Sequence, residues 1–130
     1  MVGSPDAKGF TILCIGSALD GLFQDKDHLY SRRENSIMEI SKTVSNSNKS
    51  LAKGTCRELY KGPISRSMAV DSEFVYFTAL DRIMRVRKTT QETESLVTKL
   101  VNPVLVLLDD ANIYFVDAGP PAIIGSIKKP

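Results

Sequence analysis

The chain has 130 residues, of which 42% are apolar and 25% are charged, as in an ordinary globular domain. Its 17 basic and 15 acidic residues leave a net charge of +2, which is too small to predict nucleic-acid binding from charge alone. The longest apolar run, residues 104–108, is far shorter than the roughly 18 residues of a membrane-spanning helix. We therefore expect neither a nucleic-acid nor a membrane partner.

The first residues lack the basic start and apolar stretch of a signal peptide. This favours a cytoplasmic location by default, or an extracellular one if the chain is a fragment of an exported protein. Cys14 and Cys56 do not form a metal set by themselves. We interpret them first as small buried residues, and their pairing in a disulfide stays open.

Short β-branched, aromatic and apolar segments separated by turn residues predict strands along the chain. In chain order they are residues 10–15, 67–70, 74–77, 83–88, 95–101, 104–107 and 112–116. Residues 36–44 and 95–101 are also compatible with helical spacing, so a single-domain α+β fold is the alternative. No 3.6-residue period is sustained over the length of a usual helix, however.

One pattern occurs three times and can be aligned on three tyrosines about 40 residues apart, a spacing close to that of propeller blades. Each copy has an Asp five residues before the Tyr, an aliphatic residue directly before it, and later two spaced aliphatic residues and a Lys. The matching positions are Asp25, Leu29, Tyr30, Ile37, Ile40 and Lys42; Asp71, Val75, Tyr76, Ile83, Val86 and Lys88; and Asp109, Ile113, Tyr114, Ile124, Ile127 and Lys129. A weaker match aligns Ser50-Leu51 with Ser95-Leu96.

Short strands repeated at this period predict an all-β fold, a partial β-propeller of about three four-stranded blades. The expected division is one repeat domain, 1–130, with approximate units 10–53, 64–101 and 102–130. Three blades do not close a ring, since propellers have typically 4–8. Three possibilities stay open: a fragment of a longer propeller, a homo-oligomer that closes the ring, or a last strand supplied by residues 10–15.

The second and third copies resemble the repeats of the YWTD and NHL-like propeller families. Tyr114-Phe115-Val116-Asp117 is the closest match to the Tyr-Trp-Thr-Asp signature, whereas the first copy keeps only Tyr30. The resemblance implies a non-enzymatic binding or scaffold module with a protein or small-ligand partner and no cofactor. Some similar propellers are hydrolases, so a lactonase-type hydrolase with an axial metal is one alternative. A small α+β partner-binding protein is another.

The three repeated aspartates could form a carboxylate ring that holds a cation. Because each precedes a turn, we favour the simpler interpretation that each caps its own turn by bonding the backbone. His28, the only histidine, has no evident catalytic partner and is expected at the start of a strand.

A binding site in a propeller is expected where loops from successive units converge. The turns that follow the tyrosine strands contribute four polar residues to one such face. This predicted loop face consists of Arg33, Asp81, Arg82 and Asp117. No catalytic residue and no metal ligand is predicted.

Overall fold

A computed structural model describes residues 9, 13–14, 18–43, 56–65 and 67–130. This part of the chain contains eleven strands and no helix, and hence no helix that is long and apolar enough to cross a membrane. The strands are β1 (Leu19–Gln24), β2 (His28–Arg33), β3 (Ser36–Ser41), β4 (Cys56–Lys61), β5 (Met68–Val70), β6 (Phe74–Ala79), β7 (Arg82–Arg87), β8 (Thr93–Val97), β9 (Pro103–Leu108), β10 (Asn112–Asp117) and β11 (Ile123–Lys128).

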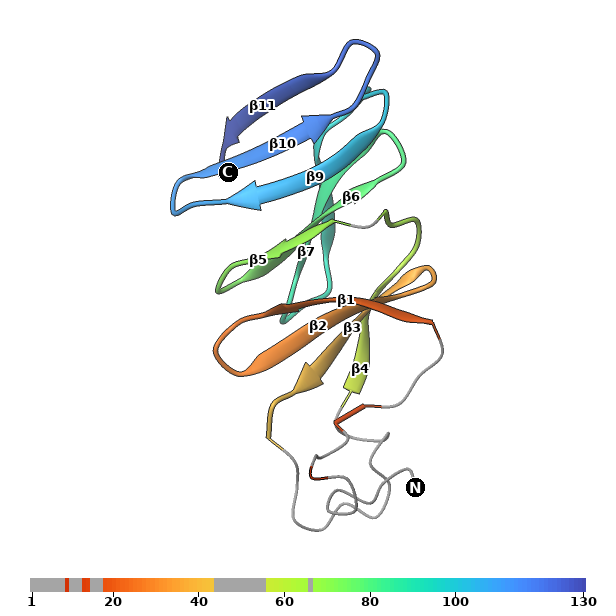
Figure 1. Ribbon diagram of the computed structural model, residues 1–130. Coiled ribbons are helices and arrows are strands. Elements are labelled where there is room, and N and C mark those ends of the chain that lie inside the picture. The colour runs from red at the N-terminus through yellow and green to blue at the C-terminus, as the bar shows by residue number, and fades with distance from the viewer. Residues whose placement is uncertain (1–8, 10–12, 15–17, 44–55, 66) are drawn as a thin grey trace.

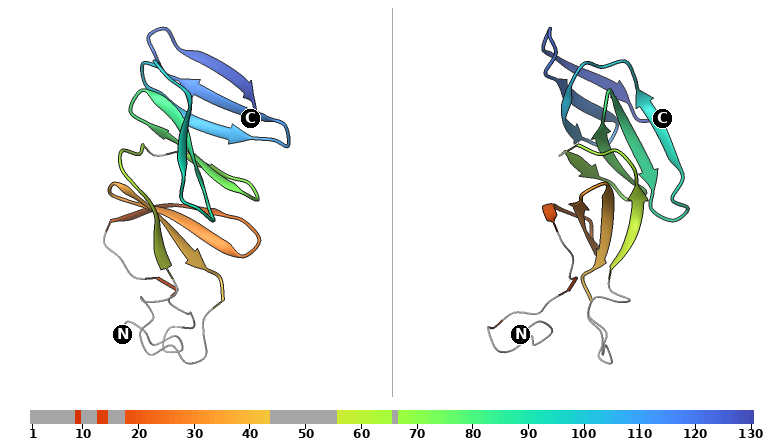
Figure 2. Two further views of the ribbon diagram at one scale, coloured as in Figure 1. Left: turned by 180° about the vertical axis from the view of Figure 1, so that it is seen from behind. Right: turned by 90° about the vertical axis from the view of Figure 1, so that its right-hand side faces the viewer.

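The strands form three antiparallel sheets in which neighbours in sequence are neighbours in space. Sheet 1 is β1–β2–β3–β4, sheet 2 is β5–β6–β7–β8, and sheet 3 is β9–β10–β11. They follow one another like layers, with sheet 2 between the other two (Figures 1 and 2). The all-β prediction is confirmed. The α+β alternative is wrong, because the first segment with helical spacing contains β3 and the second overlaps β8.

The fourth strands of sheets 1 and 2 share one irregularity, although their sequences do not align by eye. In each, the register shifts by one residue opposite the third strand, which leaves Leu59 in β4 and Leu96 in β8 without a direct partner. Leu59 is therefore the counterpart of Leu96, not Leu51 as the sequence match proposed. Sheet 1 ends at Lys61, the last residue of β4. The segment 10–15 lies mostly outside the described residues.

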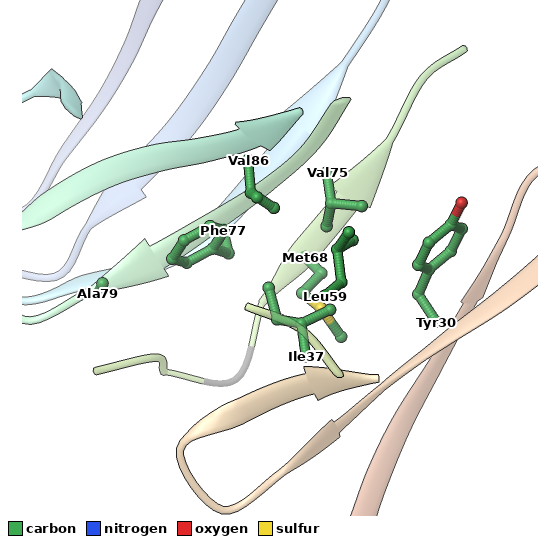
Figure 3. Packing of buried hydrophobic residues seen from close by; sticks show 8 residues of the cluster. All are labelled: Tyr30, Ile37, Leu59, Met68, Val75, Phe77, Ala79 and Val86. Carbon is green, nitrogen blue, oxygen red and sulfur yellow. The ribbon is translucent and has the colours of Figure 1, made fainter. Parts of the chain in front are cut away.

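A first apolar core fills the space between sheets 1 and 2 (Figure 3). Sheet 1 contributes Tyr30, Ile37 and Leu59, which face residues of sheet 2 including Val75 and Phe77. All five are essentially inaccessible to solvent. Side chains alternate between the two faces of a strand, and these five lie on the faces that sheets 1 and 2 turn toward each other. This packing makes sheets 1 and 2 one structural unit.

A second core of the same kind lies between sheets 2 and 3. Tyr76 and Ile83 of sheet 2 pack with Ile113 and Phe115 of sheet 3. The backbone N–H of Val106 also donates to the hydroxyl of Ser67, at 2.9 Å across the same boundary. Since Tyr76 and Ile83 repeat Tyr30 and Ile37, equivalent positions of successive units bury themselves against the next sheet.

Cys14 and Cys56 are paired in a disulfide, with their Cα atoms 5.8 Å apart. The sequence favoured two separate buried cysteines, and this interpretation is wrong. The bond attaches the segment before β1 to the first residue of β4, a contact between residues 42 positions apart. Two cysteines alone carry no positional information, so the pairing becomes apparent only once the strands are placed.

Candidate functional site

Between its first and second strands, each sheet has the same arrangement of an aspartate, a tight turn and a tyrosine. In sheet 1, Asp25 Oδ1 accepts hydrogen bonds from the backbone N–H groups of Asp27 (3.0 Å) and His28 (2.7 Å). Its Oδ2 accepts a third bond, 2.7 Å long, from the hydroxyl of Tyr30. The turn-capping prediction is confirmed, and His28 is the first residue of β2 as expected. The role of the tyrosine hydroxyl was not predicted.

The same three bonds recur in the other sheets, with nearly the same lengths. Asp71 accepts from the amides of Glu73 and Phe74 and from the Tyr76 hydroxyl at 2.9, 2.8 and 2.9 Å. Asp109 accepts from the amides of Ala111 and Asn112 and from the Tyr114 hydroxyl at 2.9, 2.7 and 2.7 Å. The carboxylates are thus engaged within their own units. No group of three or more potential metal ligands is found among the described residues.

The repeated lysine links each sheet to the one before it. Lys88 of sheet 2 places its Nζ 2.5 Å from Asp25 Oδ2 and 5.3 Å from the ring centre of Tyr30. Lys129, which follows sheet 3, lies 3.2 Å from Asp71 Oδ2 and 5.9 Å from the ring centre of Tyr76. Cations favour both the carboxylate and the ring face. We call this set of Asp, Tyr and following Lys the inter-sheet clamp.

The clamp changes the acid–base behaviour of its members. Burial acts to raise the pKa of the Asp25 carboxyl, but hydrogen bonds from Lys88, Tyr30 and two backbone amides outweigh it and hold that pKa well below its usual range. The pKa of Asp71 is lowered for the same combination of reasons. The pKa of Tyr30 is raised well above its usual value, by burial first and then by its bond to Asp25. Asp25 and Asp71 are therefore ionised and Tyr30 is neutral at pH 7.

A polar cleft of about 400 Å³ opens beside the first clamp, at the boundary of sheets 1 and 2. The floor carries charges that are paired inside the protein: Asp25 with Lys88, and Glu39 with Arg57 at 2.6 Å. The more exposed residues at the rim carry both positive and negative charges. The lining as a whole consists of Asp25, Asp27, His28, Tyr30, Glu39, Arg57, Ser72, Glu73, Arg87, Lys88 and Thr89.

The cleft contains one imidazole and two aliphatic hydroxyl groups. His28 is its only imidazole, and within the described residues no hydrogen bond joins the ring to Ser72 or Thr89, the two hydroxyl groups of the lining. An activated nucleophile needs such a base within hydrogen-bond reach. The cleft is open, and charged side chains of both signs line it. The sequence did not predict the cleft, because its walls come from two units.

The predicted loop face lies at the opposite ends of the strands, where β2, β6 and β10 finish. Arg33 and Asp117 are the last residues of β2 and β10, and Arg82 is the first residue of β7. Arg82 Nε donates to Asp81 Oδ1 at 3.0 Å. Asp117 is buried and accepts bonds from the amides of Val101, Asn102 and Gly119, as a structural cap does. Ligand binding by this face stays a prediction.

Comparison with solved structures identifies the fold. The chain is similar to a chain in the crystal structure of a nidogen/laminin complex, with a TM-score of 0.62 and 23% identity, covering 85% of this chain and 44% of that one. The nidogen part of that complex is a YWTD β-propeller. Two structures of a Trichoderma reesei carbohydrate-active enzyme of family AA12, with iodide and with calcium, match at TM-scores of 0.58 and 0.57 and 13% identity.

The match covers 31% of each of the two enzyme chains, and 80% and 81% of this chain. The chain thus spans less than half the length of each of these three chains. No family model matches the chain, and no curated protein does either. At these identities the likeness shows the fold alone, and it confirms the expectation from the sequence: the three sheets are blades of a β-propeller, and the resemblance to YWTD-type propellers holds at the level of the fold.

Proposed function

We propose that the chain is a non-enzymatic protein-binding module and that its partner contacts the polar cleft between sheets 1 and 2. The observation that carries the proposal is the arrangement of charge there. Asp25 and Lys88 are fixed at the floor, while the side chains of Glu73 and Arg87 lie 3.5 Å apart and reach solvent at the rim. Charged groups at a rim steer a partner and fix its orientation.

The fixed floor supports specificity, because the rim residues stand on a rigid base. Arg57 bonds both Glu39 and the backbone carbonyl of Lys88, the latter at 2.6 Å. Arg87 lies over the ring of Phe74, 4.5 Å from its centre. A guanidinium stacked in this way loses little conformational freedom when a carboxylate binds it. We therefore propose an acidic or mixed-charge protein segment as the ligand.

The proposal places the module outside the cell. A disulfide between Cys14 and Cys56 supports this location, since such bonds persist in oxidising compartments and are rare in the cytosol. The nidogen of the similar structure is in complex with laminin. Purified laminin is accordingly the first probe to use.

The experiment compares two arginines of the same strand. Arg82 and Arg87 begin and end β7, and their side chains are 39% and 37% exposed, so they differ in position but hardly in exposure. Laminin is passed over the immobilised chain in a surface plasmon resonance assay. We expect binding by the unaltered chain and by Arg82→Glu, and at least tenfold weaker binding by Arg87→Glu.

The converse result, in which only Arg82→Glu loses binding, would overturn the cleft and favour the loop face. Equal binding by all three forms would exclude both faces. No binding of laminin by the folded, unaltered chain would refute laminin as the ligand. Circular dichroism spectra of each variant verify that the sheets are intact.

A further inference from the structure

A second hollow, of about 360 Å³, lies at the hairpin of β7 and β8 and shares one residue, Arg87, with the polar cleft. We call it the hairpin hollow. Its lining consists of Phe74, Arg87, Glu92, Thr93 and Glu94. Because the cleft and the hairpin hollow meet at one arginine, a chain segment bound in the cleft can continue into the hollow without leaving the surface.

The cleft and the hairpin hollow have opposite arrangements of charge at their floors. In the cleft, Glu39 of β3 pairs with Arg57 of β4, its direct partner in the register. In sheet 2 the same two positions hold Arg85 of β7 and Glu94 of β8. The Nε and Nη2 atoms of Arg85 lie 2.7 and 2.6 Å from Glu94 Oε1. Both floors are thus neutralised within the protein, so the exposed charges around them select the ligand.

Glu92 is a charge of the hairpin hollow that the protein leaves uncompensated. The residue is exposed and makes no ion pair within the described residues, although its carboxylate accepts a 3.3 Å hydrogen bond from the Thr90 hydroxyl. Arg87 lies opposite it in the hairpin, since the Arg87 N–H donates to the Glu92 carbonyl at 2.8 Å. The two side chains line the same hollow. The surface therefore presents a guanidinium and an unpaired carboxylate next to each other.

The guanidinium of Arg87 is open to a carboxylate from outside. Its counter-ion Glu73 lies 3.5 Å away and has a side chain that is 67% exposed, so water screens this pair. A guanidinium also has five N–H donors, more than one carboxylate accepts. The Arg87 side chain can thus bind a second carboxylate, while Glu92 attracts a cation.

We propose that this surface recognises an extended protein segment with an acidic and a basic side chain two residues apart, the acidic one on Arg87 and the basic one on Glu92. The inference rests on the proposed function, because the cleft holds the neighbouring part of the segment. The spacing fits: opposite residues of a hairpin have Cβ atoms about 5 Å apart, and alternate side chains of an extended segment point the same way about 6.7 Å apart.

The test measures NMR chemical shifts of the isotope-labelled full chain during titration with synthetic peptides at low salt. The probes are Gly-Ser-Asp-Gly-Lys-Ser-Gly, the same peptide with Asp and Lys exchanged, which presents the charges in the opposite chain direction, and a version of each with Gln in place of Lys. We expect one of the two charged peptides to shift the amide signals of Arg87 and Glu92, and high salt to weaken its binding.

Two carboxylate variants identify the contact. Glu92→Gln should weaken binding of that charged peptide about threefold, as the loss of an exposed ion pair does, and should leave binding of its Gln version unchanged. Glu34→Gln, at another exposed carboxylate without an ion pair in the described structure, lies in the β2–β3 turn and should change neither.

Equal weakening of the charged peptide and its Gln version by Glu92→Gln would overturn the inference, because the carboxylate would then not contact the basic residue. Shifts confined to Asp81 and Arg82, or no shifts with either charged peptide, would overturn it as well. The outcome is distinguishable from that of the laminin assay. Laminin binding that Arg87→Glu abolishes, without any response to the peptides, would leave the cleft and refute the hollow, whereas Glu92-dependent peptide binding without laminin binding would support the hollow and refute laminin.

Discussion

Replacing Asp25 with Asn removes the charge of the first inter-sheet clamp while keeping its shape. The asparagine oxygen still accepts the two backbone amides, but its NH2 group then faces two donors, the Tyr30 hydroxyl and the Lys88 ammonium. The Asp25 and Lys88 side chains are 20% and 10% exposed, so the lysine is left with little contact to water and without its carboxylate, although it still donates to the Asp71 carbonyl. We expect a loss of about 3 kcal/mol of unfolding free energy, the lower end for breaking a buried pair.

A double-mutant cycle separates the ion pair from the turn cap. Lys88→Met removes the ammonium and keeps the apolar stem, and in that background Asp25→Asn should cost only about 1 kcal/mol, as a neutral hydrogen bond does. The coupling energy between the two positions is then about 2 kcal/mol. Lys128→Met, at an exposed lysine for which no ion pair is seen in the described structure, should change stability by less than about 0.5 kcal/mol.

The assay is urea unfolding at pH 7, followed by circular dichroism. A coupling energy below about 0.5 kcal/mol would refute the reasoning, because it would mean that the clamp geometry contributes nothing beyond the separate residues. The pH dependence gives a second check. The pKa of Asp25 is depressed in the folded state, so its contribution is complete above its unfolded pKa of about 3.9 and is lost as the pH falls further. Asp25→Asn should flatten this acid limb.

Three other outcomes follow from single features. Thr78→Val should stabilise the chain by about 1 kcal/mol, since the buried Thr78 hydroxyl has no partner among the described residues; urea unfolding measures it. Reduction of the Cys14–Cys56 disulfide should lower stability by up to about 4 kcal/mol from the loop entropy of the unfolded chain, measured with and without reductant. Burial, opposed by Arg85 and assisted by Asp71, raises the pKa of Tyr76 to about 12, so ultraviolet titration should detect its ionisation near that pH, with stability lost between about pH 10 and 12.

The sequence predicted those elements that are determined by residues close to one another along the chain. Short runs of β-branched, aromatic and apolar residues located β6, β7, β9 and β10, and the short turns with Asp at their start indicated capping. Both signals depend on neighbours within a few residues. The three-fold recurrence then led to the correct fold class, because few folds besides a propeller repeat one short-stranded pattern at a blade-sized period.

The features that the sequence did not predict depend on how units stack. The lysine of each copy was recognised as a repeated position, but its partner is the aspartate of the preceding copy, as Lys88 and Asp25 show. Strand β4 was missed because the connection before it is longer than the one before β8. Glu39 and Arg87 line the cleft but belong to different sheets, so no contiguous sequence motif predicts it.

The repeated aspartate organises every unit in the same way, and on this claim the interpretation of the whole chain depends. Residue-resolved amide hydrogen exchange by NMR at neutral pH tests it directly, because the N–H groups of His28, Phe74 and Asn112 lie at strand starts and each donates to its unit's aspartate. We expect all three to exchange slowly, and Asp25→Ala, which removes the acceptor, to accelerate exchange at His28 far more than at Phe74. Rapid exchange of these amides in the unaltered chain, at the rate of an unstructured peptide, would contradict the claim.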